Sequence, residues 1–399
     1  MNFSDYDVII AGGSLSGLLS AQEIANHGND VLVLEEHSVI GLPEKCDGLV
    51  SLNALSSLGI IPNWKIIQNK IIGARLFAPS GECIEVDSSK LDIVVLNRAK
   101  FDKQLSEQAM SSGVKIDLSN KYIDLKTNEN LIIRSQNHTR SCKYFIDAMG
   151  ITSLIQKRRF GIIQAAKYII EADWFENNKV DLYFNQKLSP GFFTWVIPIN
   201  ENIAKVGIAG YGINPFSHLD SFLKTRKSKI ISKIACPIVV SGPLDSFIED
   251  SIIRVGDSAG QTKPSTAGGI FSGGVGGILA GQNISTNLEF NNNSLYRYEK
   301  IWKNIFQKEF NMTLRARQIF EKLENKHLDK IFNILSSSSD FLDMVNNADD
   351  FDFHSYTLLQ SLGLKNIVQI IKLVSGSEFF SFFQQINYDD ISIFEQNDK

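Results

Sequence analysis

Residues suited to binding phosphate and sugar hydroxyl groups occur in two separated stretches of the chain. The first is the turn Gly12-Gly13-Ser14-Leu15-Ser16-Gly17, which is followed by Glu35. The second runs from Gly256 to Ile270 and contains Asp257, Gly268 and Gly269. Backbone N–H groups of a glycine-rich turn at a helix start can bind phosphate, and a carboxylate can accept hydrogen bonds from ribose. Together the two stretches predict a nucleotide-cofactor site.

The elements around the first turn have the order of a dinucleotide-binding unit. Asp7–Ala11 and Val31–Leu34 are nearly all apolar and are expected to be buried parallel strands. A helix-like run from Leu18 to Gly28 separates them, so that a pyrophosphate would lie at the helix N-terminus. Ser14 replaces the middle glycine of G-x-G-x-x-G, and its small side chain still allows close approach. A glycine-rich turn without a ligand is the alternative.

Two carboxylates narrow the choice of cofactor. Glu35 ends the second strand, roughly twenty residues after the turn, where a ribose-binding carboxylate is expected. It would repel the 2′-phosphate of NADP, so FAD or NAD fits better. Asp257 follows the strand-like run Ile252–Val255 and precedes a glycine-dense helical segment, Ile270–Gly281. A second, distant motif of this kind favours FAD, whose ribityl chain extends far from the pyrophosphate. Capping of the following helix is the alternative role for Asp257.

Composition excludes several other classes of protein. The 399 residues are 43% hydrophobic and 21% charged, as in a globular protein large enough for two interleaved domains. A net charge of −4 gives no reason to expect nucleic acid as a partner. The cysteines and histidines are scattered, so no metal site is expected. No run of 18 or more apolar residues is present, and nothing resembling a signal peptide precedes Asp7, so we expect a cytoplasmic protein without membrane-spanning helices.

The remaining pattern predicts an α/β (α+β) fold with interleaved domains. A helix is expected to begin at Asn97–Asp102, and Val114–Ile116 and Tyr144–Gly150 are strand-like. Alternating segments such as Lys179–Phe184 and Phe193–Ile197 predict an antiparallel sheet. We therefore expect a Rossmann-like FAD-binding domain (1–60, 90–160 and 250–285), an antiparallel-sheet substrate domain (61–89 and 161–249) and a C-terminal helical region (286–399).

The spaced motifs resemble the FAD superfamily typified by para-hydroxybenzoate hydroxylase. They are Gly12…Gly17 with Glu35, Arg98-x-x-x-Asp102, and Gly256-Asp257-x-Ala259-Gly260…Pro264…Gly268-Gly269-Ile270. Two further segments resemble the geranylgeranyl reductase family, in particular the archaeal type acting on digeranylgeranylglycerophospholipids. Pro43-Glu44-Lys45-Cys46-Asp47-Gly48 matches P-x-x-C-x-G. Phe193-x-Trp195-x-Ile197-Pro198 with Gly207-Ile208-Ala209 is similar to Y-x-W-x-F-P…G-x-G, with Phe193, Ile197 and Ala209 substituted. The resemblance covers about residues 1–290.

The resemblance implies an FAD-dependent oxidoreductase that saturates double bonds of prenyl chains in membrane lipids or prenylated precursors. A hydride from reduced FAD would reach one alkene carbon and a proton the other. The residues expected to bind FAD are Gly12, Gly13, Ser14, Ser16, Gly17, Glu35, Glu36, Lys45, Cys46, Arg98, Asp257, Gly268, Gly269 and Ile270. Those expected to contact the prenyl chain are Phe193, Trp195 and Pro264, with Phe192 beside them. An ion pair with Asp102 is the alternative for Arg98, and ordinary strand packing is the alternative for the aromatic residues.

Cys46 is the catalytic candidate. It lies in a loop bounded by Pro43 and Gly48, shortly after Glu35, where the chain should pass near the flavin. The thiol could donate a proton or gate the substrate, and Lys45 beside it could lower its pKa. A small buried hydrophobic side chain is the alternative. The other cysteines, Cys83, Cys142 and Cys236, are expected to be structural.

Expected partners follow from the same resemblance. They are a prenyl-chain lipid and an electron donor such as NADPH or ferredoxin, which would bind transiently because the chain shows no second dinucleotide motif. Ile367–Leu373 and Phe379–Phe383 are candidates for peripheral membrane contact, with a buried core helix as the alternative. Two other functions stay open. One is a flavin-dependent monooxygenase or halogenase, the latter disfavoured because Phe193-x-Trp195-x-Ile197-Pro198 has only half of W-x-W-x-I-P. The other is a non-catalytic flavoprotein that binds prenyl lipid.

Overall fold

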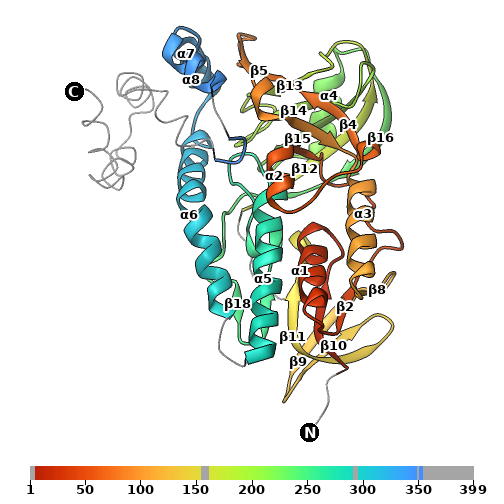
Figure 1. The fold of residues 1–399 in the computed structure, drawn as a ribbon. Coiled ribbons are helices and arrows are strands. Elements are labelled where there is room, and N and C mark those ends of the chain that lie inside the picture. Colours follow the sequence, from red (N-terminus) through yellow and green to blue (C-terminus); the bar gives the residue numbers. More distant parts are fainter. Residues whose placement is uncertain (1–4, 154–160, 291–294, 348–349, 354–399) are drawn as a thin grey trace, which may run out of the picture.

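The computed structural model describes residues 5–153, 161–290, 295–347 and 350–353, and it combines two large sheets with a group of helices (Figure 1). The strands are β1 Tyr6–Ala11, β2 Val31–Leu34, β3 Leu49–Ser51, β4 Ile67–Ile71, β5 Gly73–Phe77, β6 Cys83–Asp87, β7 Ile93–Leu96, β8 Lys115–Asp117, β9 Tyr122–Thr127, β10 Leu131–Ser135, β11 Thr139–Asp147, β12 Ile162–Glu171, β13 Lys179–Tyr183, β14 Thr194–Pro198, β15 Ile203–Gly210, β16 Lys229–Ala235, β17 Ile238–Val239, β18 Ile248–Glu249 and β19 Ile252–Arg254. The α-helices are α1 Leu15–Asn26, α2 Leu52–Ser57, α3 Arg98–Ser111, α4 Pro215–Leu223, α5 Ile270–Phe290, α6 Leu295–Phe320, α7 Asn325–Ser336 and α8 Ser339–Asn346.

The first sheet contains the predicted N-terminal unit. Its order is β18-β19-β11-β1-β2-β8, and β1 pairs in parallel with both β11 and β2. The strands predicted at Asp7–Ala11 and Val31–Leu34 are confirmed as β1 and β2. The apolar side chains of β1 alternate between two cores, so that Val8 and Ile10 pack on the side of α1 and α5, and Ile9 packs on the side of β9 and β10. Burial on both faces explains the nearly continuous apolar sequence.

The second sheet has the order β16-β12-β15-β14-β13-β5-β6. Its neighbours are antiparallel, as expected, except that β13 pairs in parallel with β5, which comes from an earlier part of the chain. One face packs on α4 through a core that includes Tyr168, Val206 and Phe222. The other face carries Trp195, Ile197 and Ala209 and lies toward the first sheet. Residues on β14 and β15 can therefore reach the space between the sheets.

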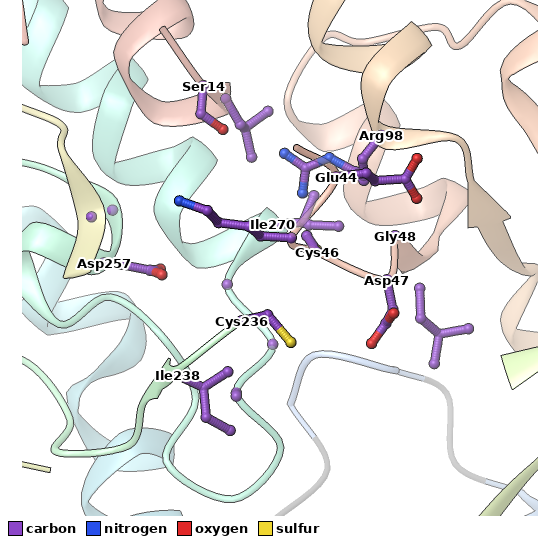
Figure 2. A pocket seen from close by; sticks show the side chains of 18 of the residues that line it. Ser14, Glu44, Cys46, Asp47, Gly48, Arg98, Cys236, Ile238, Asp257 and Ile270 are labelled. Atoms are coloured by element: carbon purple, nitrogen blue, oxygen red, sulfur yellow. The ribbon is translucent and has the colours of Figure 1, made fainter. Parts of the chain in front are cut away.

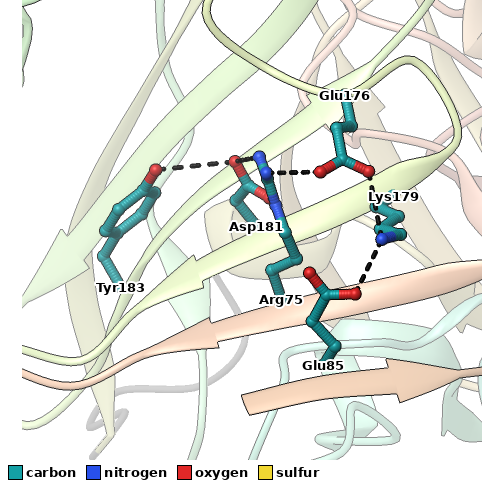
Figure 3. Close-up of polar contacts among 6 residues, drawn as sticks. All are labelled: Arg75, Glu85, Glu176, Lys179, Asp181 and Tyr183. Carbon is teal, nitrogen blue, oxygen red and sulfur yellow. Dashed lines mark hydrogen bonds and ion pairs between the residues drawn. The ribbon is translucent and has the colours of Figure 1, made fainter. Parts of the chain in front are cut away.

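A buried ion pair joins β5 to β13 in the second sheet (Figure 3). Arg75 donates to both carboxylate oxygens of Asp181, at 2.7 and 2.8 Å, and to Glu176 at 2.6 Å. Asp181 is fully buried, and its burial raises its pKa against the opposing effect of Arg75. Lys179 extends the network outward to Glu85 and Glu176. The network fixes the parallel pairing of two strands from distant parts of the chain.

Smaller elements connect the two sheets. The strands β3, β7 and β4 form a third sheet in which β4, from the range assigned to the substrate domain, pairs with β7. Helix α3 follows β7 and begins at Arg98 after the N-cap Asn97, whose side chain accepts the N–H of Lys100, so the predicted helix start is confirmed. Figure 1 shows α1, α5 and α6 arranged side by side along the first sheet. The helix predicted at Ile270–Gly281 is confirmed and continues as α5 to Phe290.

The described C-terminal part is helical, as predicted for the chain beyond residue 285. Helices α7 and α8 dock against the β5–β6 edge, where Asp329 and Asn346 accept the backbone N–H groups of Ser80 and Asp87. The proposed membrane-facing segments Ile367–Leu373 and Phe379–Phe383 lie outside the described residues. Of the helices that are described, none combines the length and apolarity needed to cross a membrane.

Candidate FAD and substrate site

A cavity of about 690 Å³ lies between the two large sheets. Its wall includes both glycine-rich stretches, Glu35, the loop around Cys46, Arg98 and the aromatic side chains of Phe192, Phe193 and Trp195. Figure 2 shows Ser14, Arg98, Cys46 and Asp257 around one space, although they come from distant parts of the sequence. The fold therefore brings the predicted cofactor and substrate residues together around the cavity, except that Gly17 and Pro264 are not part of its wall.

The N-terminal turn requires glycine for steric reasons. Gly12 has φ +109°, and a Cβ on it would lie 2.3 Å from the carbonyl oxygen of Ala148. A Cβ on Gly17 would lie 2.1 Å from the carbonyl oxygen of Gly12. The first turn of α1 can therefore pack this closely against the glycine-rich turn only because residue 17 has no side chain. Ser14 is the N-cap of α1, but its side chain makes no capping hydrogen bond. The first turn of α1 also contains no acidic residue, which leaves its N–H groups available to an anion.

Glu35 lies at the end of β2 beside this turn. One carboxylate oxygen accepts the N–H of Gly13 at 2.9 Å, and the other accepts the N–H of His37 at 2.9 Å and contacts its Nδ1 at 2.7 Å. The neighbouring Glu36 pairs instead with Lys121 at 3.0 Å. Burial alone would raise the pKa of Glu36, but Lys121, His37 and Lys45 lower it below its usual value. Glu35 is the more enclosed of the two carboxylates and lies next to the turn.

Arg98 and Asp102 form a buried pair at the start of α3. The Arg98 Nη2 lies 2.8 and 3.1 Å from the two carboxylate oxygens of Asp102, so the i,i+4 pairing considered from the sequence is present. The Nε of Arg98 is buried and has no hydrogen-bond partner among the described residues. Burial would lower the pKa of Arg98, but Asp102 and then Cys46 raise it above its usual range. A fixed cation with an unused N–H beside a helix N-terminus fits the pyrophosphate of FAD.

The second glycine-rich stretch lies on another side of the cavity. Gly256 has φ +61° and starts a short 3₁₀ turn, Gly256–Ala259, that includes Asp257. The Oδ1 of Asp257 accepts the hydroxyl of Thr262 at 2.6 Å. A Cβ on Gly269 would lie 3.3 Å from Thr262 Oγ1, and one on Gly268 would lie 3.1 Å from Lys263. These two glycines thus allow the chain to pack on itself at the start of α5, whose first residue, Ile270, lines the cavity.

Pro264 lies outside the cavity wall, although Lys263 and Thr266 on either side are part of it. The carbonyl oxygen of Pro264 accepts from Arg317 Nη1 at 3.4 Å, and its ring lies near Gly242. The spacing of residues in a turn does not determine the direction of each side chain, which is why the sequence could not place this residue.

The loop that carries Cys46 runs along the cavity wall. Cys46 is exposed and lines the cavity, whereas Cys236, which is also part of the wall (Figure 2), is buried, as is Cys142. Gly48 has φ +80°, and a Cβ on it would lie 2.4 Å from the carbonyl oxygen of Leu96. The absence of a side chain at this position therefore allows the loop to pack closely against β7. The indole Nε1 of Trp195 donates to Asp47 Oδ2 at 2.8 Å. These contacts connect the P-x-x-C-x-G segment directly to the tryptophan motif.

Aromatic side chains form another part of the cavity wall. The rings of Phe192 and Phe193 stack at 4.1 Å between centroids, and Trp195 meets Phe193 edge-on at 6.1 Å. Val180, Leu182 and Ile197 extend the same apolar surface. Such a wall suits a hydrocarbon chain, because it offers contact area without polar groups that would need partners.

Two residues of this region were not predicted from the sequence. Lys167 on β12 and Lys205 on β15 are fully buried, and their ammonium groups contact the loop around Cys46. A signal was present, because each lysine interrupts an apolar strand: Ala165-Ala166-Lys167-Tyr168 and Ala204-Lys205-Val206. A lysine inside a buried strand is rare unless it is paired. In the part of the chain that is described, no cluster of metal-ligating side chains was found.

Comparisons with known proteins agree with this geometry. Residues 5–210 match the family described as FAD binding domain. An uncharacterized protein of Methanocaldococcus jannaschii is 31% identical over 372 residues, covering 88% of this chain and 93% of the relative. A digeranylgeranylglycerophospholipid reductase of the same organism is 28% identical over 364 residues, covering 85% and 93%.

Solved structures share the fold. A geranylgeranyl bacteriochlorophyll reductase-like protein from Thermoplasma acidophilum superposes with a TM-score of 0.80 at 24% identity, covering 93% of this chain and 99% of that chain. A flavin-dependent brominase superposes with a TM-score of 0.63 at 14% identity, covering 96% and 99%. Proteins with different chemistry thus have this architecture, so the fold alone does not decide the reaction.

Proposed function

This chain belongs to the FAD-binding domain family, and from that premise we propose that it saturates carbon–carbon double bonds in geranylgeranyl chains of membrane lipids or prenylated precursors. The protein is an FAD-dependent oxidoreductase. The finer assignment is supported by the archaeal reductase that is 28% identical over most of both chains. It is also supported by the two motifs, around Cys46 and around Trp195, that meet in the cavity.

The observation that carries the proposal is the position of Cys46. Its thiol side chain is exposed on a wall shared by the cofactor residues Ser14 and Arg98 and by the aromatic residues Phe193 and Trp195. An isolated alkene has no charged group by which an enzyme could orient it. Catalysis must therefore depend on holding the chain in an apolar slot next to the cofactor and a proton donor.

The residues of this chain have separable roles in such a reaction. Bound FAD in its reduced form supplies a hydride to one alkene carbon. Cys46 would donate its thiol proton to the other carbon, and the resulting thiolate would regain a proton from water. Arg98 lines the same cavity as Cys46 and is charged, so it would stabilise that thiolate. Phe192, Phe193 and Trp195 would hold the prenyl chain and exclude water from it.

The electrons must come from a separate donor in this proposal. One glycine-rich dinucleotide turn is present at Gly12–Gly17, and FAD would occupy it. NADPH or a ferredoxin would then reduce the flavin in a transient encounter. Rapid mixing of the oxidised protein with each donor, followed by the bleaching of flavin absorbance, distinguishes the two.

An anaerobic assay tests the proposed reaction. Reduced holoprotein is incubated with a digeranylgeranyl glycerolipid, and the molecular mass of the product is measured by mass spectrometry. We expect a gain of two hydrogens for each double bond reduced. Cys46→Ala should keep FAD and lose this activity, whereas Cys83→Ala, at an exposed cysteine outside the cavity wall, should keep both. Full activity of Cys46→Ala would remove the thiol from the mechanism.

The same assay distinguishes the competing functions. Under air, incorporation of oxygen or halide into an acceptor would identify a monooxygenase or halogenase, whose solved representatives share this fold. Stoichiometric FAD and tight lipid binding without turnover, in the presence of either donor, would identify a flavoprotein that only binds prenyl lipid.

A further inference from the structure

Two buried lysines stand out in the sheet face that lines the cavity. Lys167 on β12 and Lys205 on β15 are both 0% exposed. Lys167 pairs with Gly207 and Lys205 with Ile169 in the β12–β15 register, so both side chains project from the same face. Their neighbours on that face are apolar and include Ala165, Trp195 and Ala209. Placing two ammonium groups there costs several kcal/mol in desolvation unless each is fully paired.

Each ammonium group is paired with the loop that carries Cys46. Lys167 Nζ donates to the carbonyl oxygen of Cys46 at 2.9 Å and lies 3.2 Å from Asp47 Oδ1. Lys205 Nζ donates to Glu44 Oε1 at 2.7 Å and to the carbonyl oxygen of Asp47 at 2.8 Å. Its third contact is the carbonyl oxygen of Leu96 at 3.3 Å. The two lysines thus contact Glu44, Cys46 and Asp47 of the loop and Leu96 of the adjacent strand β7.

The charges fit this arrangement. Burial alone would lower the pKa of Lys167, but Asp47, Cys46 and Glu44 raise it above its usual value, so its ammonium stays charged. Asp47 completes the connection, because its second carboxylate oxygen accepts the indole N–H of Trp195. Figure 2 shows Glu44, Asp47 and Gly48 along the loop segment that borders the cavity. An apolar residue in place of either lysine would leave one loop carbonyl and one carboxylate without the ammonium that contacts them.

We propose that Lys167 and Lys205 are positioning residues that hold the Cys46 loop against the sheet, so that the thiol keeps a fixed place relative to the flavin and the prenyl chain. The inference rests on the proposed function, in which Cys46 donates a proton. Neither lysine is part of the cavity wall, so each would act on the reaction through the loop. Both should therefore affect the reaction rate more than FAD affinity, because the pyrophosphate and ribose contacts lie elsewhere.

The test replaces Lys167 with methionine, which has a similar length and no charge. The matched control is Lys229→Met, at a lysine on β16 of the same sheet that is 78% exposed. Three quantities are measured on the holoproteins: FAD affinity, kcat and KM for a prenyl lipid, and the maleimide labelling rates of Cys46 and Cys83 by peptide mass mapping. Cys83 is exposed and lies outside the cavity wall, so it serves as an internal standard.

For Lys167→Met we expect unchanged FAD affinity, a kcat lower by about 10- to 100-fold with little change in KM, and an altered ratio of Cys46 to Cys83 labelling. Lys229→Met should match the wild type. An unchanged labelling ratio and kcat in a folded Lys167→Met protein would overturn the inference. If this variant does not fold, Lys167→Met/Asp47→Asn removes both members of the pair, keeps an acceptor for Trp195, and is judged by the same ratio.

The labelling ratio also separates this inference from the proposed function. A wild-type protein that reduces no prenyl lipid, but whose Cys46 labelling depends on Lys167, would contradict the proposed reaction and support the positioning role. If the wild type and Lys167→Met reduce prenyl lipid at the same rate, the result would support the proposed reaction and contradict the positioning role.

Discussion

The indole ring of Trp195 occupies the space that a side chain on Gly207 would need. These residues are direct partners across β14 and β15, and a Cβ on Gly207 would lie 2.2 Å from two ring atoms of Trp195. The ring therefore lies flat against the neighbouring strand, and its N–H reaches Asp47 beside Cys46. The glycine of the G-x-G motif and the tryptophan of the preceding motif thus form one packing unit, which explains why they occur together.

Gly207→Ala should disturb this unit. The added methyl group must displace the indole, which would lose its hydrogen bond to Asp47. Overpacking of this kind costs about 1–3 kcal/mol in the free energy of unfolding. Urea unfolding and tryptophan fluorescence measure the two effects. Gly59→Asn is the control, because Gly59 has φ +69°, which asparagine tolerates, and has nothing within 4 Å of its Cβ position. A Gly207→Ala protein with wild-type stability and fluorescence would show that the ring is not held by this contact.

Glu35 and Glu36 should differ in their effect on FAD binding. Glu35 lies beside the Gly13 N–H, where the ribose is expected, whereas Glu36 pairs with Lys121. Loss of a charge-assisted hydrogen bond costs about 1.5–3 kcal/mol, so Glu35→Gln should weaken FAD affinity by roughly 10- to 100-fold. Glu36→Gln should change it much less. Titration of the apoproteins with FAD, followed by flavin fluorescence, gives both constants, and equal losses would contradict the assignment of the ribose to Glu35.

Local patterns in the sequence were sufficient to predict strands β1, β2, β8, β11 and β19 of the first sheet and the two glycine-rich turns, but not β9, β10 and β18. The reason is local for both glycines of the first turn: Gly12 has a positive φ of +109°, and a side chain on Gly17 would collide with the carbonyl oxygen of Gly12, so their spacing is visible in the sequence. The roles of Gly207, Lys167 and Lys205 depend on which strands become neighbours and in what register. That information is non-local, as is the parallel pairing of β5 with β13. A lysine in an otherwise apolar strand indicates that its ammonium group has a partner in the folded protein. The sequence does not indicate which residue that partner is.

The Arg75–Asp181 pair should contribute more to stability than its outer neighbours (Figure 3). Asp181 is fully buried, so Arg75→Met would leave an uncompensated carboxylate and cost about 3–5 kcal/mol in the free energy of unfolding. Lys179→Met is the control. Its partner Glu85 is 60% exposed, and such a pair contributes about 0–1 kcal/mol. Thermal and urea unfolding give both values. Arg75→Met/Asp181→Asn should recover part of the loss, and equal effects of the two single variants would contradict the special role of the buried pair.

The buried thiols should make the protein less stable in alkali. Burial raises the pKa of Cys142 and that of Cys236 from 9.0 to about 12. Below pH 9 both thiols are protonated in the folded and unfolded chain, so their contribution to stability is fully present. Between pH 9 and 12 the unfolded chain loses these protons and the folded chain keeps them, so stability falls by about 1.4 kcal/mol per pH unit for each thiol. Urea unfolding at pH 8, 9 and 10 measures the free energy of unfolding, which should decline less steeply with pH for Cys142→Ala than for the wild type. Any difference in stability between the two proteins at pH 8 does not affect this comparison of slopes. Parallel curves would mean that Cys142 ionises as readily in the folded protein as in the unfolded chain.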